Sequence, residues 1–509
     1  MPLTAVFDVV GSLSWTQLAL GATSFTILWF LVTSTVAWYK LRHIPGPFFA
    51  SFSNIWLVWT AYSGLSHLII DAEQKKHGSV LRTGPADVAI FDPETLMRIN
   101  SARSPYTRGM WYRSARVDYR ADSVLTELDI GAHGKRKSKL ASAFSGKNVA
   151  RLESKVDEWI AALIAKIHTN IASGRETMDI GKLVQYFQVD LISDIQLGEP
   201  WGDLEGNKDA FGFLKMSDNF LPAMQSFAAL PLARAIYTSP WFMRLFGPKP
   251  TDTSGLGLFI GIIEKEVNRR FGSNIEKPSE SRDLLDIWID HGLTPDECQL
   301  DLSLLVPAGT ETTASMIRGT LLLLGSSPVP YRKLKQELRD AIAAGRISNP
   351  VTNDEAKRLE YLQAVISEGF RLMVPISFGF PKVVPPSGDT ICGKFIPGGT
   401  NVYPNYHGMM RNKEVFGHDA DIFRPERFLD DEHKAAYMRK VTDLAFGAGR
   451  FMCLGKALAL IEMNKIFVEL LRNFDIQTAS PERPWQRTGY TTWIIDNFLT
   501  RVTEDTTMR

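Results

Sequence analysis

The sequence has little cysteine and almost no net charge. Its 509 residues include only three cysteines, Cys298, Cys392 and Cys453, which are far apart and odd in number. They therefore predict no disulfide framework, and they fit a reducing compartment in which one cysteine is free for chemistry. A formal net charge of +1 leaves no electrostatic footprint for nucleic acid, so we expect no nucleic-acid partner. The length allows one large domain or two to three ordinary ones.

Several common catalytic motifs are also missing. The Gly-rich run at 255–260 ends in Ile260, where a dinucleotide-binding fingerprint needs its third glycine. Gly64-Leu65-Ser66 lacks the closing glycine of a serine-hydrolase elbow. No Cys or His residues have the pair spacing of a zinc site. The chain therefore carries no evident nicotinamide or flavin site, and any redox chemistry needs electrons from a partner protein.

Charge is also missing from most of the N-terminal region. Residues 9–39 contain no Asp, Glu, Lys or Arg, and the apolar part at 18–39 is long enough to cross a bilayer as a helix. Lys40 and Arg42 follow this stretch, whereas no Lys or Arg precedes it, so the positive-inside rule places the rest of the chain in the cytosol. The alternative is a cleaved signal peptide, but the apolar run is too long and lacks a basic start.

These features predict three parts of the chain. Residues 1–43 form a membrane anchor, residues 44–50 form a stiff Pro-Gly hinge, and residues 51–509 form the catalytic domain. Within that domain, the apolar periodicity predicts helices at 149–171 and 180–197, and the residues at 78–93 predict a hairpin. The apolar segment at 219–248, broken by Pro222, Pro231, Pro240 and Pro248, forms either a membrane-dipping lid or ordinary packing between helices.

Cys453 lies in a loop with several glycines, residues 446–455, directly before an apolar-periodic helix. The backbone N–H groups and the positive end of the dipole at a helix N-terminus favour a thiolate there. The glycines allow positive φ and let the backbone pass close to a flat or bulky group. From these residues alone, Cys453 is either a functional thiolate or a plain buried cysteine.

A second unusual stretch lies in the apolar segment from Leu302 to Leu324, which predicts a long buried helix. Its middle reads Pro307-Ala308-Gly309-Thr310-Glu311-Thr312-Thr313. An acid and several hydroxyls inside a buried helix are costly unless they have a purpose. Pro307 and hydroxyls that bond back to carbonyls bend helices, and a kink with small Ala308 and Gly309 leaves room for a diatomic ligand. The alternative is a Thr-rich buried helix with a capped bend.

Together these stretches resemble the cytochrome P450 superfamily from the Pro-Gly hinge to the C-terminal strands. Phe446, Gly449, Cys453 and Gly455 match its haem-binding loop in order and spacing. The family usually has arginine two residues before the cysteine; here Phe451 fills that place, and Arg450 lies one position earlier. The resemblance implies that Cys453 is the axial thiolate ligand of haem b (iron protoporphyrin IX), which favours O–O cleavage.

The resemblance assigns roles to other residues as well. It implies that Glu311 and Thr312 relay protons to oxygen, and that Glu368, Arg371 and Arg427 form a structural network of buried charges. The expected contacts to haem, beyond the loop glycines and Phe446, are Arg450, His133, Lys137 and Lys382. The expected substrate-pocket residues are Ala308, Ile376, Phe378 and Trp493.

The resemblance therefore implies a mainly α-helical haem-thiolate domain with small β-sheets, preceded by one transmembrane helix. We expect a monooxygenase that inserts one oxygen atom from O₂ into a lipophilic small molecule. The NADPH-dependent cytochrome P450 reductase, a separate flavoprotein, supplies the electrons. The resemblance extends to fungal pisatin demethylases and natural-product oxidases, which implies a polyketide, terpenoid or alkaloid substrate. We expect the endoplasmic reticulum membrane, with the catalytic domain in the cytosol.

Two other functions stay open from the sequence. One is a haem-thiolate isomerase or dehydratase that needs no reductase. The other is a non-catalytic haem-binding sensor or an anchored binding protein. The adjacent acid and alcohol at Glu311 and Thr312 argue against both.

Overall fold

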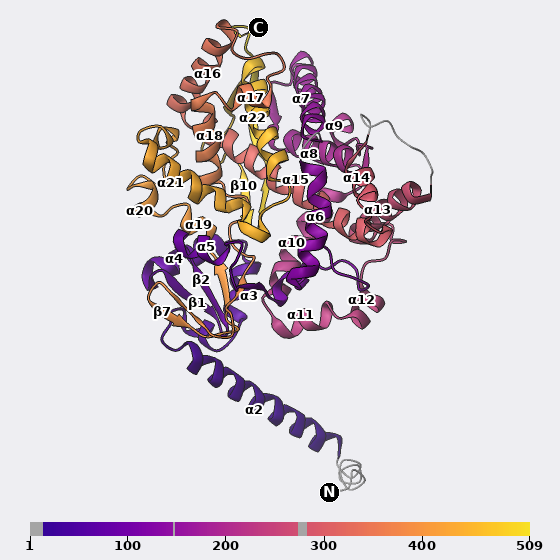
Figure 1. Ribbon diagram of the computed structural model, residues 1–509, viewed down its shortest axis with the longest axis vertical. Helices are drawn as coiled ribbons and strands as arrows, with labels where there is room; N and C mark the ends of the chain where they lie inside the picture. The colour runs from indigo at the N-terminus through magenta and orange to yellow at the C-terminus, as the bar shows by residue number, and fades with distance from the viewer. Residues whose placement is uncertain (1–13, 146–147, 273–281, 509) are drawn as a thin grey trace.

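The computed structural model describes residues 14–145, 148–272 and 282–508 and is mainly helical (Figure 1). The long helices and their shorter neighbours are α2 (Trp15–Leu41), α3 (Ile55–Tyr62), α4 (Ser66–His77), α5 (Pro93–Ile99), α6 (Ile130–Ala141), α7 (Asn148–Ala172), α8 (Ile180–Leu197), α9 (Asp203–Gly206), α10 (Phe213–Ala228), α11 (Pro231–Tyr237), α12 (Pro240–Phe246), α13 (Gly255–Gly272), α14 (Leu284–Asp290), α15 (Pro295–Gly325), α16 (Pro328–Ala343), α17 (Asn353–Ala356), α18 (Glu360–Leu372), α19 (Tyr406–Met409), α20 (Lys413–Phe416), α21 (Glu432–Asp443) and α22 (Lys456–Asn473). This confirms the mainly helical fold class.

Four small sheets accompany the helices. The largest has the order β1-β2-β8-β5-β3, in which β2 and β8 are parallel and the other pairs antiparallel. A three-stranded sheet has the order β4-β12-β9, and two hairpins pair β6 with β7 and β10 with β11. The strands are β1 (Val80–Gly84), β2 (Asp87–Ile90), β3 (Thr107–Arg108), β4 (Thr177–Asp179), β5 (Lys382–Val383), β6 (Asp389–Ile391), β7 (Lys394–Ile396), β8 (Asn401–Pro404), β9 (Phe474–Thr478), β10 (Gln486–Gly489), β11 (Trp493–Asp496) and β12 (Leu499–Glu504).

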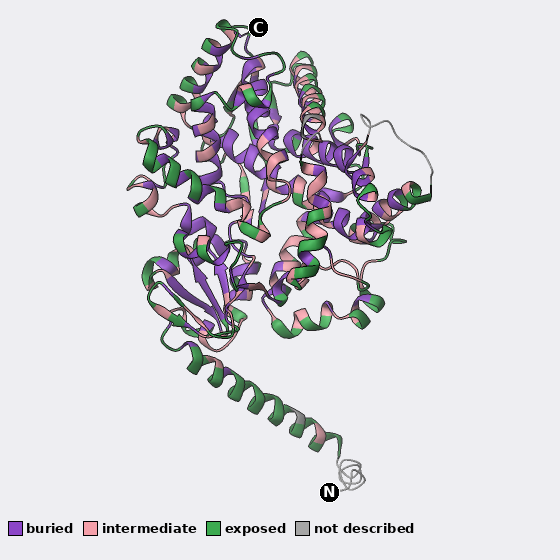
Figure 2. Cartoon of the chain, in the orientation of Figure 1, coloured by how far each residue is buried: buried purple, intermediate pink, exposed green. Residues whose placement is uncertain are grey.

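The helix α15 lies at the centre of the main core. It extends the predicted helix at 302–324 to 31 residues, and most of its side chains are buried. It packs along α8, whose bounds agree with the predicted helix at 180–197, and α7 agrees with the prediction at 149–171 within one residue at each end. Figure 2 shows this buried interior enclosed by helices that are exposed on their outer faces. The central helix is apolar on nearly every side because other helices surround it.

Helix α2 projects away from the rest of the chain and is exposed along most of its length (Figures 1 and 2). By length and composition, it is the one helix among the described residues that could cross a membrane. Its C-terminal end is nevertheless fixed to the domain. Leu41 is buried in the core beside the large sheet, and the Arg82 guanidinium donates hydrogen bonds to the carbonyls of Ala37 and Trp38 at 3.0 and 3.3 Å. The hinge packs closely as well, because a Cβ on Gly46 would lie 2.4 Å from the Arg82 carbonyl oxygen.

The apolar segment at 219–248 forms the end of α10 and the short helices α11 and α12. The prediction that Pro222 breaks this segment is wrong, since Pro222 lies inside α10 and the helix continues past it. One lost N–H bond does not end a helix whose other bonds and buried face persist. Pro231 and Pro240 begin α11 and α12, where a missing N–H costs nothing. Exposed apolar side chains line this region, on the side of the molecule from which α2 leaves (Figure 1): Phe227, Leu232, Ile236, Trp241, Leu245 and Phe246.

The predicted network of Glu368, Arg371 and Arg427 is formed and fully buried. The Arg371 guanidinium makes two hydrogen bonds of 2.7 Å to the Glu368 carboxylate, and Arg427 Nε donates to Glu368 Oε1 at 3.0 Å. The same oxygen accepts the backbone N–H of Arg424. This network joins α18 to the short helix η5 (Pro425–Phe428). On α18, the Phe370 ring packs 4.9 Å from the ring of Phe446, at the start of the cysteine loop.

We expect Glu368→Gln to lower the free energy of unfolding by about 3–5 kcal/mol, because buried Arg371 loses its carboxylate partner and buried Arg427 keeps only Asp419. Thermal and denaturant unfolding of the full-length protein measures this change. A matched control is Asp354→Asn, which removes the carboxylate of an exposed pair with Lys357 and should leave stability nearly unchanged. Equal effects of the two substitutions would show that the buried network does not support the fold.

Candidate functional site

The cysteine loop, residues 446–455, begins at the end of the short helix Leu444–Phe446 and runs to the start of α22. A second short helix, Gly449–Phe451, lies within it. Cys453 N donates to the Phe446 carbonyl at 2.7 Å, which closes the loop on itself. Gly449 has φ of +56°, and a Cβ there would lie 2.5 Å from the carbonyl oxygen of Asn100. Only glycine allows this close approach of the loop to the chain at 100–102. The loop thus holds the cysteine two residues before Gly455, the N-cap of α22.

Burial and neighbouring groups shift the pKa of the Cys453 thiol in opposite directions. Burial raises its pKa, whereas backbone N–H groups of Gly455 and Lys456 and the charge of Lys137 act to lower it. A positively charged metal ion would favour the thiolate further. Although protein surrounds the thiol on most sides, Cys453 and Met452 retain accessible surface. The expected helix N-terminal environment is therefore present, but it does not by itself outweigh the cost of burying a thiolate.

Positive groups gather around the ring of Phe451. Lys382 Nζ lies 3.8 Å from the ring centroid, and the guanidinium carbon of Arg108 lies 4.5 Å from it. The His133 ring lies 5.2 Å away, and Lys137 Nζ donates to the carbonyls of Arg450 and Met452 at 2.9 and 2.6 Å. The structure thus brings together three of the predicted haem contacts beside the loop, His133 and Lys137 from α6 and Lys382 from β5.

Burial disfavours the charged forms of two groups in this cluster. Burial and the neighbouring cations lower the pKa of His133 to about 3 and hold the pKa of Lys382 well below its usual value. Among the described residues, His133 Nδ1 and Arg108 Nε have no hydrogen-bond partner. Such groups suit a ligand with carboxylates, so they fit the two propionates of haem. Arg108, on β3, was not among the predicted contacts, because its long loop shows no periodicity and nothing in the sequence links it to Phe451.

One face of α15 is accessible inside an otherwise buried helix. Ala308 is exposed and Thr312 partly exposed, one turn apart, and the Thr312 hydroxyl donates to the Ala308 carbonyl at 2.7 Å. This confirms the expected back-bonding. Gly309 lies on a different face, where a Cβ would come within 3.0 Å of the Ile192 side chain of α8. The small size of Gly309 therefore serves the packing of α15 on α8, and the expectation that it also leaves room for a small ligand stays a prediction.

Glu311 is buried on the side of α15 that faces α8 and α10. Gln185 Nε2 donates to its carboxylate at 3.4 Å, and burial raises the pKa of Glu311 to about 7, with Arg318 opposing the shift. Arg318 is fully buried and donates to the Ile495 carbonyl at 3.1 Å. Burial and nearby Asp496 raise the pKa of Asp218 to about 6. Glu311 and Thr312 thus occupy adjacent positions but different faces, and the polar partners of Glu311 were not predicted because they come from other helices.

The remaining predicted contacts to haem and substrate differ in their burial and in their partners. The Arg450 guanidinium donates to the carbonyls of Ala102 and Ser104, and it contributes to the positive potential at His133. Ile376 is partly exposed at the edge of the core beside the large sheet. Phe378 is buried and stacks on Tyr403 with 5.1 Å between ring centroids.

Trp493 also belongs to the packed interior. It is fully buried, and its indole N–H donates to the Val374 carbonyl at 2.8 Å. The His67 ring lies 4.6 Å from it and the Arg487 guanidinium carbon 4.5 Å, so Trp493 has packing contacts on several sides.

The mainly helical fold, the cysteine loop before α22 and the cluster of cations beside it define the class of haem-thiolate proteins. Comparisons with known proteins agree. Residues 45–495 match the family Cytochrome P450. The chain is 39% identical over 471 residues to the cytochrome P450 monooxygenase aba1 of Botryotinia fuckeliana, covering 91% of this chain and 92% of that protein. It is 36% identical over 488 residues to ABA1 of Pyricularia oryzae, covering 93% and 95%.

A third relative is the cytochrome P450 monooxygenase mpaDE of Penicillium brevicompactum. It is 30% identical over 484 residues, which cover 92% of this chain but 56% of that longer protein. The chain belongs to the cytochrome P450 family and is a monooxygenase of the fungal type.

We expect Arg108→Gln to raise the rate of haem loss about tenfold or more, because a charge-assisted hydrogen bond is worth about 1.5–3 kcal/mol. Transfer of haem to apomyoglobin measures this rate without reference to turnover. Arg103→Gln, which changes an exposed arginine of the same segment, is the matched control. Adding Phe451→Arg to Arg108→Gln should restore retention, since it returns a guanidinium to the same place. Unchanged haem loss in Arg108→Gln would exclude Arg108 as a contact.

Proposed function

We propose that this chain binds haem b through Cys453 and inserts one oxygen atom from O₂ into a lipophilic secondary metabolite. The observation that carries the proposal is the cysteine loop, in which an accessible thiol lies at the N-terminus of α22 beside the nitrogen groups of Arg108, His133, Lys137 and Lys382. A thiolate ligand and a group with two carboxylates would satisfy both parts of this arrangement at once.

The cysteine loop and the residues that surround Phe451 would hold haem from two directions. Cys453 would ligate the iron, while Arg108, His133, Lys137 and Lys382 would face the propionates. Phe446 and the loop glycines would set the height of the thiolate, since the backbone at Gly449 has no space for a side chain. When bound, haem supplies the oxygen chemistry, and its thiolate ligand favours O–O cleavage.

The accessible face of α15 would supply protons. Cleavage of dioxygen to release water requires two protons, and a positioned acid and alcohol can deliver them. The Thr312 hydroxyl already donates to the Ala308 carbonyl, which leaves its oxygen able to accept a hydrogen bond. Glu311 would pass protons from the buried polar groups near Gln185 and Asp218. Because Glu311 points away from the accessible face, this step needs a rotation of its side chain or a bridging water.

The surroundings support a lipophilic substrate and a membrane location. The exposed apolar side chains of α11 and α12 lie on the same side as α2, where a substrate dissolved in lipid would enter. The relatives aba1 and ABA1 are fungal monooxygenases of similar length, which supports a role in secondary metabolism. We place the chain in the endoplasmic reticulum membrane as a single-pass protein with its catalytic domain in the cytosol, and we assign its electrons to NADPH through cytochrome P450 reductase.

The reduced, carbon-monoxide-bound protein should show the strongly red-shifted Soret band of a haem with a thiolate ligand. Cys453→Ala should abolish this band, whereas Cys392→Ala, which changes another exposed cysteine, should retain it. The comparison is made on protein that is folded and loaded with haem. A red-shifted band that survives in Cys453→Ala would assign the ligand to another residue.

Proton delivery predicts a dependence of coupling on pH. Because burial raises the pKa of Glu311 to about 7, its protonated fraction increases as pH falls through 7. The ratio of product to NADPH consumed should therefore rise between pH 8 and pH 6, about one unit on either side of that pKa. Glu311→Gln should flatten this profile, and Thr312→Ala should lower the ratio at every pH. Profiles of wild type and Glu311→Gln with the same shape would exclude Glu311 as the titrating donor.

A further inference from the structure

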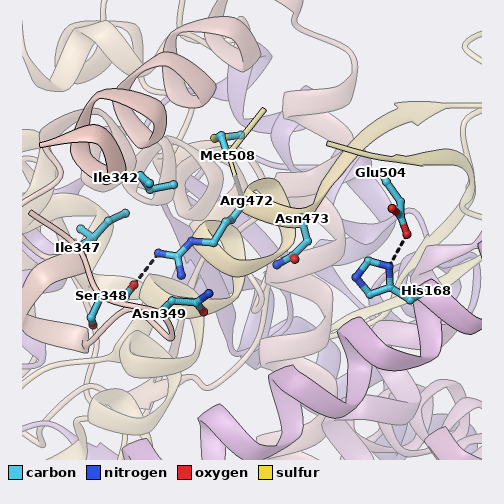
Figure 3. Close-up of a pocket in the computed structure, with 9 residues that line it drawn as sticks. All are labelled: His168, Ile342, Ile347, Ser348, Asn349, Arg472, Asn473, Glu504 and Met508. Atoms are coloured by element: carbon cyan, nitrogen blue, oxygen red, sulfur yellow. Dashed lines mark hydrogen bonds and ion pairs between the residues drawn. The ribbon is translucent and has the colours of Figure 1, made fainter. Parts of the chain in front are cut away.

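The charged groups around a cavity near the C-terminus already have partners within the protein. This cavity of about 630 Å³ lies at the end of the molecule farthest from α2 (Figures 1 and 3). Its Arg472 pairs with Glu469 at 3.2 Å, and His168 lies 2.7 Å from Glu504. Both basic residues of the lining thus have a carboxylate beside them. The side of the molecule from which α2 leaves is different in this respect.

On that side, two long segments of the chain contain no acidic residue. Although 56 of the 509 residues are Asp or Glu, none of them lies at 9–70 or at 219–251. The first segment contains α2, the short helix η1 (Phe48–Ser51), α3 and the start of α4, and the second contains the end of α10 with α11 and α12. The two segments meet in space, because α3 packs against both η1 and α10, and α10 packs against α11. Their exposed residues form one surface, here called the α2-side face.

Four exposed cations lie on the α2-side face. Lys40 and Arg42 follow the apolar part of α2, whereas Arg244 lies on α12 and Lys249 directly after it. Among the described residues, none of these four side chains forms an ion pair. Arg42 instead packs on the Tyr39 ring, with its guanidinium carbon 4.1 Å from the ring centroid. The two segments therefore carry positive charge that they do not offset themselves.

Large apolar side chains surround these cations. On α12, Arg244 lies among three exposed apolar side chains of the same short helix, and exposed aromatic rings extend the surface across η1 and α3. The largest of these side chains are Phe48, Phe49, Trp59, Trp241, Leu245 and Phe246. Basic groups beside aromatic and aliphatic ones are typical of a surface that lies in the headgroup layer of a bilayer, with its apolar side chains dipping below that layer.

The link between this face and α2 indicates which partner it meets. The end of α2 is fixed to the domain, because Arg82 donates to the Ala37 and Trp38 carbonyls and Ser34 Oγ donates to the Phe52 carbonyl at 3.0 Å. The face therefore stays within reach of any bilayer that α2 crosses. Apolar contact alone would suit an uncharged lipid surface as well, whereas the four cations match a negatively charged one.

We propose that the α2-side face docks on anionic phospholipid in the leaflet that borders the catalytic domain. Lys40 and Arg42 meet the headgroups at the end of α2, and Arg244 and Lys249 hold α12 against them through charge-assisted hydrogen bonds to phosphate and carboxylate oxygens. The proposal rests on the membrane location proposed above and adds to it a dependence on lipid charge. Anionic lipid would thus draw α11 and α12 onto the bilayer.

The test uses the full-length protein in lipid nanodiscs of phosphatidylcholine, with or without added phosphatidylserine. A nitroxide at Leu245→Cys, in a Cys392→Ser background, reports the depth of α12, because oxygen relaxes the nitroxide in lipid and a nickel chelate relaxes it in water. We expect phosphatidylserine to raise the ratio of docked to undocked protein about tenfold or more, since each Lys or Arg near an anionic surface contributes about fivefold. A nitroxide at Ala344→Cys, an exposed position directly after α16, should stay in water in both kinds of disc.

Two sets of substitutions separate lipid charge from apolar contact. Arg244→Gln with Lys249→Gln removes the cations at α12 and keeps its apolar side chains, so it should abolish most of the rise. Arg346→Gln with Lys413→Gln removes two exposed cations of other elements and should leave the rise unchanged. High salt should reduce the rise in wild type, because it screens exposed charges.

Three results would overturn the proposal and leave the membrane location standing. The first is equal depth in the two kinds of disc, which would show that apolar contact suffices. The second is an undiminished rise in Arg244→Gln with Lys249→Gln. The third is a depth that changes with the number of protein copies in each disc, which would assign the face to a second copy of the chain. Failure of the full-length chain to remain in either disc would instead overturn the membrane location together with the proposal.

Discussion

The buried carboxylate of Glu368 joins segments that lie more than fifty residues apart. It accepts hydrogen bonds from Arg371 on its own helix and from Arg427 on η5. Because none of these groups reaches water, Arg371 depends on Glu368 for its counter-charge, and Arg427 pairs with both Glu368 and Asp419. The same helix places Phe370 against Phe446, where the cysteine loop begins. The position of Cys453 therefore depends on an ion network that never touches the thiol.

The opposite side of the loop has the reverse electrostatic character. Around Phe451, burial first and then the neighbouring cations, including Arg108, lower the pKa values of His133 and Lys382. In the first network, the carboxylates of Glu368 and Asp419 balance the guanidinium groups of Arg371 and Arg427, so the network acts as a support. The second leaves Arg108 Nε and His133 Nδ1 without partners among the described residues, so it is suited to hold a group with carboxylates. Phe451 stands where the family usually has an arginine. Its ring gives Arg108 and Lys382 a surface to pack on without adding another charge.

The sequence predicted the elements of this fold well and their rotation about their own axes poorly. Helices at 149–171 and 180–197 follow from periodicity, which is local, whereas the network around Glu368 was implied by the resemblance to the family. The orientation of α15 does not, because a helix that is apolar on every side carries no sequence signal for the face on which Gly309 or Glu311 lies. Arg108 was missed for a related reason, since its approach to Phe451 depends on how β3 pairs in a sheet built from distant segments.

The hydrogen bonds from Arg82 to carbonyls near the end of α2 couple the tilt of this helix to the orientation of the whole protein. A helix of 27 residues is about 40 Å long, whereas the hydrocarbon layer of a bilayer is about 30 Å thick. A helix of this length fits the layer by tilting. Since the end of α2 is fixed to β1 and the Pro-Gly segment packs against the same strand, the tilt is passed on to the catalytic domain. Bilayer thickness would then set the angle at which α11 and α12 meet the lipid surface, and a thicker membrane would rotate the domain upright.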